Sequence, residues 1–79
     1  MDVQIIIDLE GDYQNALARL IQPVTRRAID ILFMVAQSKT KQLVFQLNID
    51  KRQLEQLKRD WNAVVGVTKV TAYGRHSNF

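Results

Sequence analysis

Three carboxylates near the start of the chain are the first candidates for chemistry. Asp8, Glu10 and Asp12 stand at alternate positions where an apolar run meets a glycine. Paired carboxylates can act as general acid and base or hold a cation. The same residues also suit a solvated strand end followed by a helix, because aspartate is a favoured N-cap residue. We favour the second interpretation.

Other residue types that could act as nucleophile, base or metal ligand are few. The single histidine, His76, lies near the C-terminus, and Ser38 and Ser77 have no base predicted beside them. Cysteine is absent, which excludes disulfides, thiolate metal sites and a cysteine nucleophile. We therefore predict that this chain carries no catalytic residue, no metal and no cofactor of its own.

Four polar or small residues could instead hold a small polar ligand at an interface between two copies of the chain. Gly11 permits a ligand to approach the backbone, while Asp12, Asn15 and Asp30 offer polar contacts. In the alternative interpretation all four are turn and cap residues, and their types favour that alternative.

Composition predicts one small soluble domain. The chain has 79 residues, 47% of them hydrophobic, and a formal net charge of +3. Such a short chain buries a modest share of its surface, so an oligomeric partner would stabilise it. Residues 1–3 have no basic segment, and the apolar run Ile5 to Ile7 is too short for a signal peptide or a membrane span. We expect a cytoplasmic protein with no membrane partner.

The apolar periodicity changes along the chain and predicts six elements. Period-two alternation or dense β-branched and aromatic content predicts strands, whereas spacings of three and four predict helices. The expected strands are 3–9, 29–36, 41–49 and 67–73, and the expected helices are 13–28 and the segment that follows Asp50. Ser38 to Thr40 should form a hairpin connection, and residues 74–79 a flexible tail.

A proline, an apolar run and a helix cap give more specific predictions for three of these elements. Pro23 lies inside the first helix and should kink it or end it early. The run from Ile29 to Ala36 is almost continuously apolar, which favours a central strand with both faces covered. Asp50 and Gln53 have the spacing of a capping box at the second helix.

The order strand, helix, strand, strand, helix, strand predicts a ferredoxin-like α+β sandwich. Right-handed crossovers place both helices on one face of a four-stranded antiparallel sheet. The other face of the sheet, with Gln4, Ile6 and Val44, is then exposed to solvent or covered by a partner. A second copy related by symmetry could cover the edges of the outer strands. The domain should span residues 1–73.

Known functions of this fold need residues that the chain lacks. RNA-binding domains expose aromatic residues on the central strands, but Phe45 falls on the predicted core face and only Phe33 could be exposed. The basic residues Lys51, Arg52, Lys58 and Arg59 lie on the second helix, where a solvated face explains them. Acylphosphatases need an arginine-bearing anion loop after the first strand, and this loop is Glu10-Gly11-Asp12, which would repel phosphate. Nucleic acid is thus a disfavoured partner.

Two blocks resemble the ACT domains of the small regulatory subunits of acetolactate synthase. The block Ala16-Leu17-Ala18-Arg19-Leu20-Ile21, followed by Arg26-Arg27-Ala28-Ile29-Asp30-Ile31, is similar to the family's first helix and second strand. The block from Asp60 to Val70 is similar to the family's closing segment. The resemblance spans residues 3–73, and the length matches the short form found in isozyme two.

The resemblance implies a non-catalytic partner in branched-chain amino-acid biosynthesis. Such subunits form homodimers through ACT domains, activate the acetolactate synthase catalytic subunit, and in many members bind a branched-chain amino acid. Thiamine diphosphate, magnesium and flavin would then belong to the catalytic subunit.

The chain departs from the family at its ligand loop. Asn15 stands where feedback-sensitive members have glycine, and Asp30 where they have asparagine. Ala28 replaces the family's glycine before the second strand. These departures favour activation by protein contact over amino-acid sensing. A stand-alone ACT-like amino-acid sensor acting on another protein is the alternative, and an RNA-binding module is a weaker one.

Overall fold

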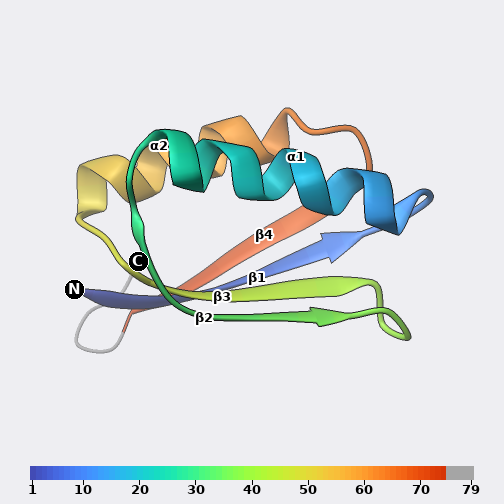
Figure 1. The fold of residues 1–79 in the computed structure, drawn as a ribbon, viewed down its shortest axis with the longest axis horizontal. Helices are drawn as coiled ribbons and strands as arrows, with labels where there is room; N and C mark the ends of the chain where they lie inside the picture. Colours follow the sequence, from blue (N-terminus) through green and yellow to red (C-terminus); the bar gives the residue numbers. More distant parts are fainter. Residues whose placement is uncertain (75–79) are drawn as a thin grey trace.

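The computed structural model describes residues 1–74 and contains four strands and two helices (Figure 1). In chain order they are β1 (Asp2–Leu9), α1 (Tyr13–Arg26), β2 (Asp30–Gln37), β3 (Gln42–Asn48), α2 (Lys51–Asn62) and β4 (Val67–Gly74). The predicted tail at 75–79, including His76 and Ser77, lies outside the described residues. Gly74, which we assigned to that tail, is the last residue of β4.

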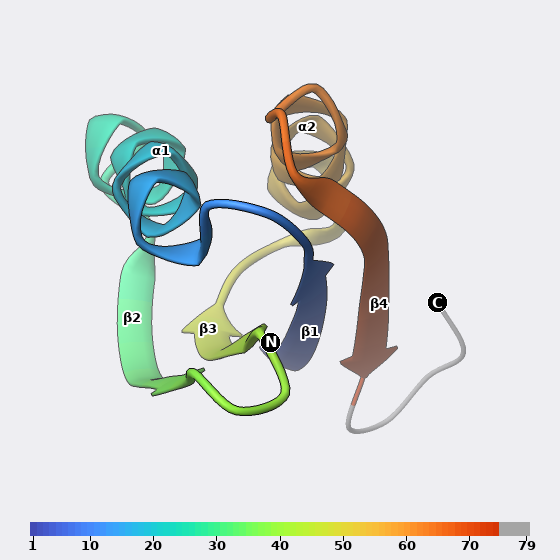
Figure 2. The same cartoon turned by 90° about the vertical axis from the view of Figure 1, so that its right-hand side faces the viewer.

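The strands form one antiparallel sheet in the order β2-β3-β1-β4, and both helices cover the same face (Figure 2). This βαββαβ arrangement confirms the predicted ferredoxin-like fold. Neither described helix is long and apolar enough to cross a membrane.

The core lies between the two central strands and the helices. On β1 and β3 every second residue is fully buried, as the alternation predicted; these residues include Val3, Ile5, Ile7, Leu43, Phe45 and Leu47. Trp61 of α2 stacks on Phe45 with ring centroids 5.3 Å apart. Its Nε1–H donates to the backbone oxygen of Leu20 at 2.8 Å, which ties α2 to α1.

Both helices begin at the aspartates that the sequence predicted as caps. The Asp12 carboxylate accepts from the Asn15 N–H at 3.2 Å. Asp50 and Gln53 form a complete capping box, with the Gln53 N–H 2.7 Å from Asp50 Oδ1. The cap at Asp12 shows that this carboxylate, at least, stabilises the fold.

The first helix is shorter than predicted, and Pro23 does not end it at once. The helix continues through Pro23 and stops at Arg26, one turn later, rather than at Ala28. Proline removes the bond to Arg19 but leaves the following residues helical. Ala28 then takes a left-handed conformation (φ +53°), and the chain turns into β2.

The predicted central position of the second strand is wrong. β2 is an edge strand, and large side chains on it are exposed: Ile31 36%, Leu32 47%, Phe33 54% and Met34 43%. In a βαββαβ sheet the first and third strands take the centre, so the second must lie at an edge. Apolar content alone does not show where in a sheet a strand lies.

Candidate functional site

Three of the four predicted ligand-binding residues lie together in the loop between β1 and α1. Gly11, Asp12 and Asn15 line a cavity of about 260 Å³. Arg19 of α1 and Val65 of the α2–β4 connection also line this cavity. Neither of these two residues was predicted as part of a site, because sequence patterns do not place the α2–β4 connection beside the first loop.

Backbone contacts hold the loop in place. The Glu10 N–H donates to the Gly66 oxygen at 2.8 Å, so the loop is bonded to the α2–β4 connection. Gly11 and Gly66 have φ of +75° and +100°, which glycine adopts without strain. The two connections at this end of the sheet therefore form one unit.

The cavity presents charges of both signs. Glu10 and Asp12 contribute carboxylates, and Arg19 contributes a guanidinium. A zwitterion such as an amino acid needs an acceptor for its ammonium and a donor for its carboxylate. These groups could supply both, and amino-acid binding stays a prediction.

Asp30 lies at the other end of the sheet. It is the first residue of β2 and stands opposite Asn48, which in turn pairs with Asp2 at the start of β1. The loop with Gly11 follows the end of β1, on the order of 20 Å away at about 3.3 Å per strand residue. A single copy of the chain thus does not bring Asp30 to the other three residues.

The carboxylates considered for catalysis do not converge. Asp8 Oδ1 accepts from Gln42 Nε2 at 2.8 Å on the open face of the sheet, whereas Asp12 caps α1. Within residues 1–74, no group of three or more histidine, cysteine, aspartate or glutamate side chains could hold a metal ion. Ser38 lies exposed in the β2–β3 hairpin.

The edge strand carries four consecutive exposed apolar residues, which we call the β2 patch: Ile31, Leu32, Phe33 and Met34. Among the described strands β2 pairs with β3 alone, so the backbone groups on its outer edge lack a strand partner. No charged residue or proline lies between Ile31 and Gln37. Edge strands that must stay unpaired normally carry such residues.

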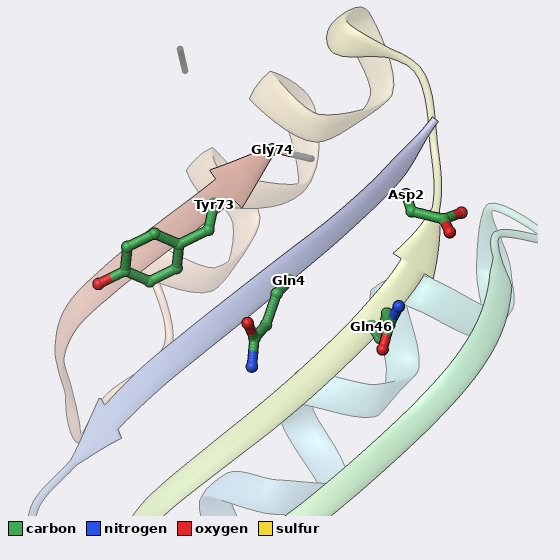
Figure 3. Close-up of a pocket in the computed structure, with 5 residues that line it drawn as sticks. All are labelled: Asp2, Gln4, Gln46, Tyr73 and Gly74. Atoms are coloured by element: carbon green, nitrogen blue, oxygen red, sulfur yellow. The ribbon is translucent and has the colours of Figure 1, made fainter. Parts of the chain in front are cut away.

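The open face of the sheet carries a polar row with an aromatic residue at each end. Phe33 stands opposite Gln46, Gln46 opposite Gln4, and Gln4 opposite Tyr73. Figure 3 shows three of these side chains on neighbouring strands, where they line a cavity of about 270 Å³ with Asp2 and Gly74. Tyr73 was not predicted as part of this row, because only the strand register places it beside Gln4.

This face does not reproduce the aromatic pattern of RNA-binding domains. Phe45 is fully buried, as predicted, and Phe33 is exposed but lies on the edge strand. The central strands β1 and β3 present Gln4, Ile6 and Val44 there instead. Base stacking needs aromatic side chains on these strands.

Comparison with known proteins gives the fold. No protein-family model and no curated protein matches the chain. Among solved structures, acylphosphatase from Bacillus subtilis is similar with a TM-score of 0.74 at 11% identity, covering 98% of this chain and 87% of that one. The CheA P2 domain from Thermotoga maritima, solved in complex with CheY, has a TM-score of 0.69 at 8% identity, with 91% and 94% covered.

A third similar structure is the acetolactate synthase small subunit from Thermotoga maritima. Its TM-score is 0.59 at 20% identity, and the match covers 95% of this chain and 47% of that one. The chain therefore spans about half the length of that subunit. At these identities the shared property of all three structures is the ferredoxin-like fold.

Proposed function

We propose that this chain is a non-catalytic regulatory small subunit that binds and activates the catalytic subunit of acetolactate synthase. The observation that carries the proposal is the pair of blocks at residues 16–31 and 60–70 that resemble such subunits. The β2 patch, an apolar edge strand without a partner in the single chain, supports their assembly as dimers. The partner's identity rests on the motif resemblance, and the small subunit from Thermotoga maritima supports it through the shared fold.

The β2 patch calls for a protein partner by two physical arguments. Each exposed apolar side chain gains about 25 cal/mol for every Å² removed from water. An added strand would also satisfy the backbone N–H and C=O groups along the outer edge. We expect a second copy to cover this edge, since two antiparallel β2 strands related by a two-fold axis present the same surface to each other.

In this proposal the chemistry belongs to the larger partner. Thiamine diphosphate, magnesium and flavin would be bound by the catalytic subunit. The small subunit would raise its rate by contact, as part of branched-chain amino-acid biosynthesis.

The test is reconstitution. The purified chain is added to the catalytic subunit from the same organism, and acetolactate formation is measured. We expect a saturable rise in rate. Acylphosphatase from Bacillus subtilis, which shares the fold, is the matched control and should have no effect. A rate unchanged at saturating small subunit, with no complex on gel filtration, would reject the proposal.

The cavity with charges of both signs favours a second candidate function, an amino-acid-sensing domain acting on another protein. Titration with valine, leucine and isoleucine, followed by backbone amide shifts, tests it. Shifts at Gly11, Asp12 and Asn15 would support sensing. If Asp30 also moves, the site includes residues from two copies; if no residue moves, activation by contact alone remains.

A further inference from the structure

The helices and the sheet carry opposite net charge. The basic helical layer, defined as α1 and α2 with their cap residues, has seven arginine and lysine side chains against Asp12, Asp50, Glu55 and Asp60, a net +3. The rest of residues 1–74 has three lysines against four carboxylates, a net −1. Figure 2 shows the two helices side by side above the sheet, so this positive charge lies on one side of the molecule.

Most of these cations have no carboxylate close to them. Arg27 pairs with Asp60 at 2.6 Å, and Arg26 approaches the same oxygen at 4.0 Å. In the part of the chain that the structure describes, no carboxylate lies within 4.0 Å of five others: Arg19, Lys51, Arg52, Lys58 and Arg59. Their charge is available to a partner.

A groove between the helices adds apolar contact area to this charge. It has a volume of about 450 Å³, and Arg19 and Arg26 of α1 line one side. Val64 and Val65 contribute apolar surface, and Val65 is 80% exposed. Protein interfaces combine an apolar centre with an enrichment in arginine, and this groove offers both.

We propose that the basic helical layer, centred on the groove beside Arg19 and Arg26, docks onto an acidic surface of the catalytic subunit that also presents an aliphatic side chain. This inference rests on the proposed function and assigns a second surface to it. The β2 patch then pairs two copies, and the helices face the enzyme.

The same features disfavour nucleic acid as the occupant. Neither aromatic residue of the helices is free to stack on a base: Trp61 is buried, and Tyr13 donates to the Gln42 oxygen at 3.3 Å. Within residues 1–74 the exposed large aromatic residues, Phe33 and Tyr73, lie on strands.

A second copy is also a poor occupant of this layer. Its sheet side has the complementary charge, but helix-to-sheet stacking is a head-to-tail contact. Such a contact has no two-fold axis and produces rings or open filaments rather than a closed dimer. The charge of the helices therefore fits a different protein.

The test compares charge reversals on the helices with a matched reversal elsewhere. Arg19→Glu/Arg26→Glu changes the groove, and Arg52→Glu/Arg59→Glu changes α2. Lys39→Glu/Lys41→Glu makes the same change of charge at the β2–β3 hairpin. Circular dichroism checks that each variant is folded. The α2 variant keeps the test valid if the groove variant unfolds because its reversed charge repels Asp60.

Affinity for the purified catalytic subunit is then measured by calorimetry at 50 and 300 mM salt. We expect the helix variants to bind at least about 10-fold more weakly at low salt, and the hairpin variant to bind within about 2-fold of the wild type. Wild-type affinity should also fall at high salt, because screening weakens exposed charge pairs.

Three results would contradict either the proposed function or the proposed docking surface. If the wild type does not bind the catalytic subunit, the proposed function fails. If it binds and the folded helix variants bind equally well, the docking surface is wrong while the proposed function stands. The helix variants could also bind the catalytic subunit normally but fail to bind a labelled RNA or DNA duplex, or fail to self-associate in sedimentation. Either result would show that the basic helical layer does not bind an acidic protein partner.

Discussion

The indole of Trp61 donates from Nε1 to the backbone oxygen of Leu20 at 2.8 Å, across the boundary between the two helices. The same ring stacks on Phe45 of the central strand β3. One side chain therefore joins α1, α2 and the sheet.

We predict that Trp61→Phe destabilises the domain by about 1–2 kcal/mol. Phenylalanine keeps an aromatic ring against Phe45 but loses the donor to Leu20, and a buried hydrogen bond contributes about that amount. Urea unfolding followed by circular dichroism measures it, because the chain has no other tryptophan for fluorescence. Arg59→Ala, at an exposed position of α2, is the control; an effect no larger than the control's would show that the bond is not needed.

We predict that Gly66→Ala is more damaging than Gly11→Ala. A Cβ at Gly66 would lie 3.0 Å from the Glu10 oxygen, whereas a Cβ at Gly11 has no atom within 4 Å. Both positions have positive φ, so each substitution carries a conformational cost of about 1–2 kcal/mol. Gly66→Ala adds the close contact with backbone. Thermal unfolding of the two variants gives the difference, and equal losses would contradict the close approach.

We predict that Asp50→Ala lowers stability by about 1 kcal/mol. The substitution removes the acceptor for the Gln53 N–H and breaks the capping box of α2. Asp50→Asn, which keeps an oxygen at the cap, should retain most of the stability. Urea midpoints for the pair separate the hydrogen bond from the charge; equal losses in both would assign the effect to charge.

We predict that the chain is a dimer at micromolar concentration and that Phe33→Asp makes it a monomer. Phe33 is 54% exposed in the single chain, so the substitution removes little from the core and places a charge in the pairing surface. Sedimentation velocity measures the state of both proteins. Tyr73→Asp, equally exposed at 55% on β4, is the matched control and should stay dimeric. A monomeric wild type, or a dimer that survives Phe33→Asp, would contradict pairing through β2.

Much of the fold could be predicted from local patterns. The alternation of apolar and polar residues predicted the buried faces of β1 and β3, because only one face of each strand packs on the helices. The caps at Asp12 and Asp50 could be predicted because their partners lie three residues away.

What could not be predicted depends on long-range pairing. The apolar run of β2 looks the same whether another strand or solvent lies beside it. Asp30 is close to α1 in sequence, but it enters β2 at the end of the sheet opposite Gly11. Val65 joins the first loop only because Gly66 bonds to Glu10.

The exposed edge of β2 also bears on how the chain behaves when it is made in excess. Residues Ile31 to Gln37 form a seven-residue stretch without charge, proline or glycine, which is the composition of segments that stack into fibrils. A copy whose edge stays uncovered offers a template to any other copy. Pairing of two copies through β2 covers this edge, so we expect aggregates to form chiefly from copies that have not yet paired.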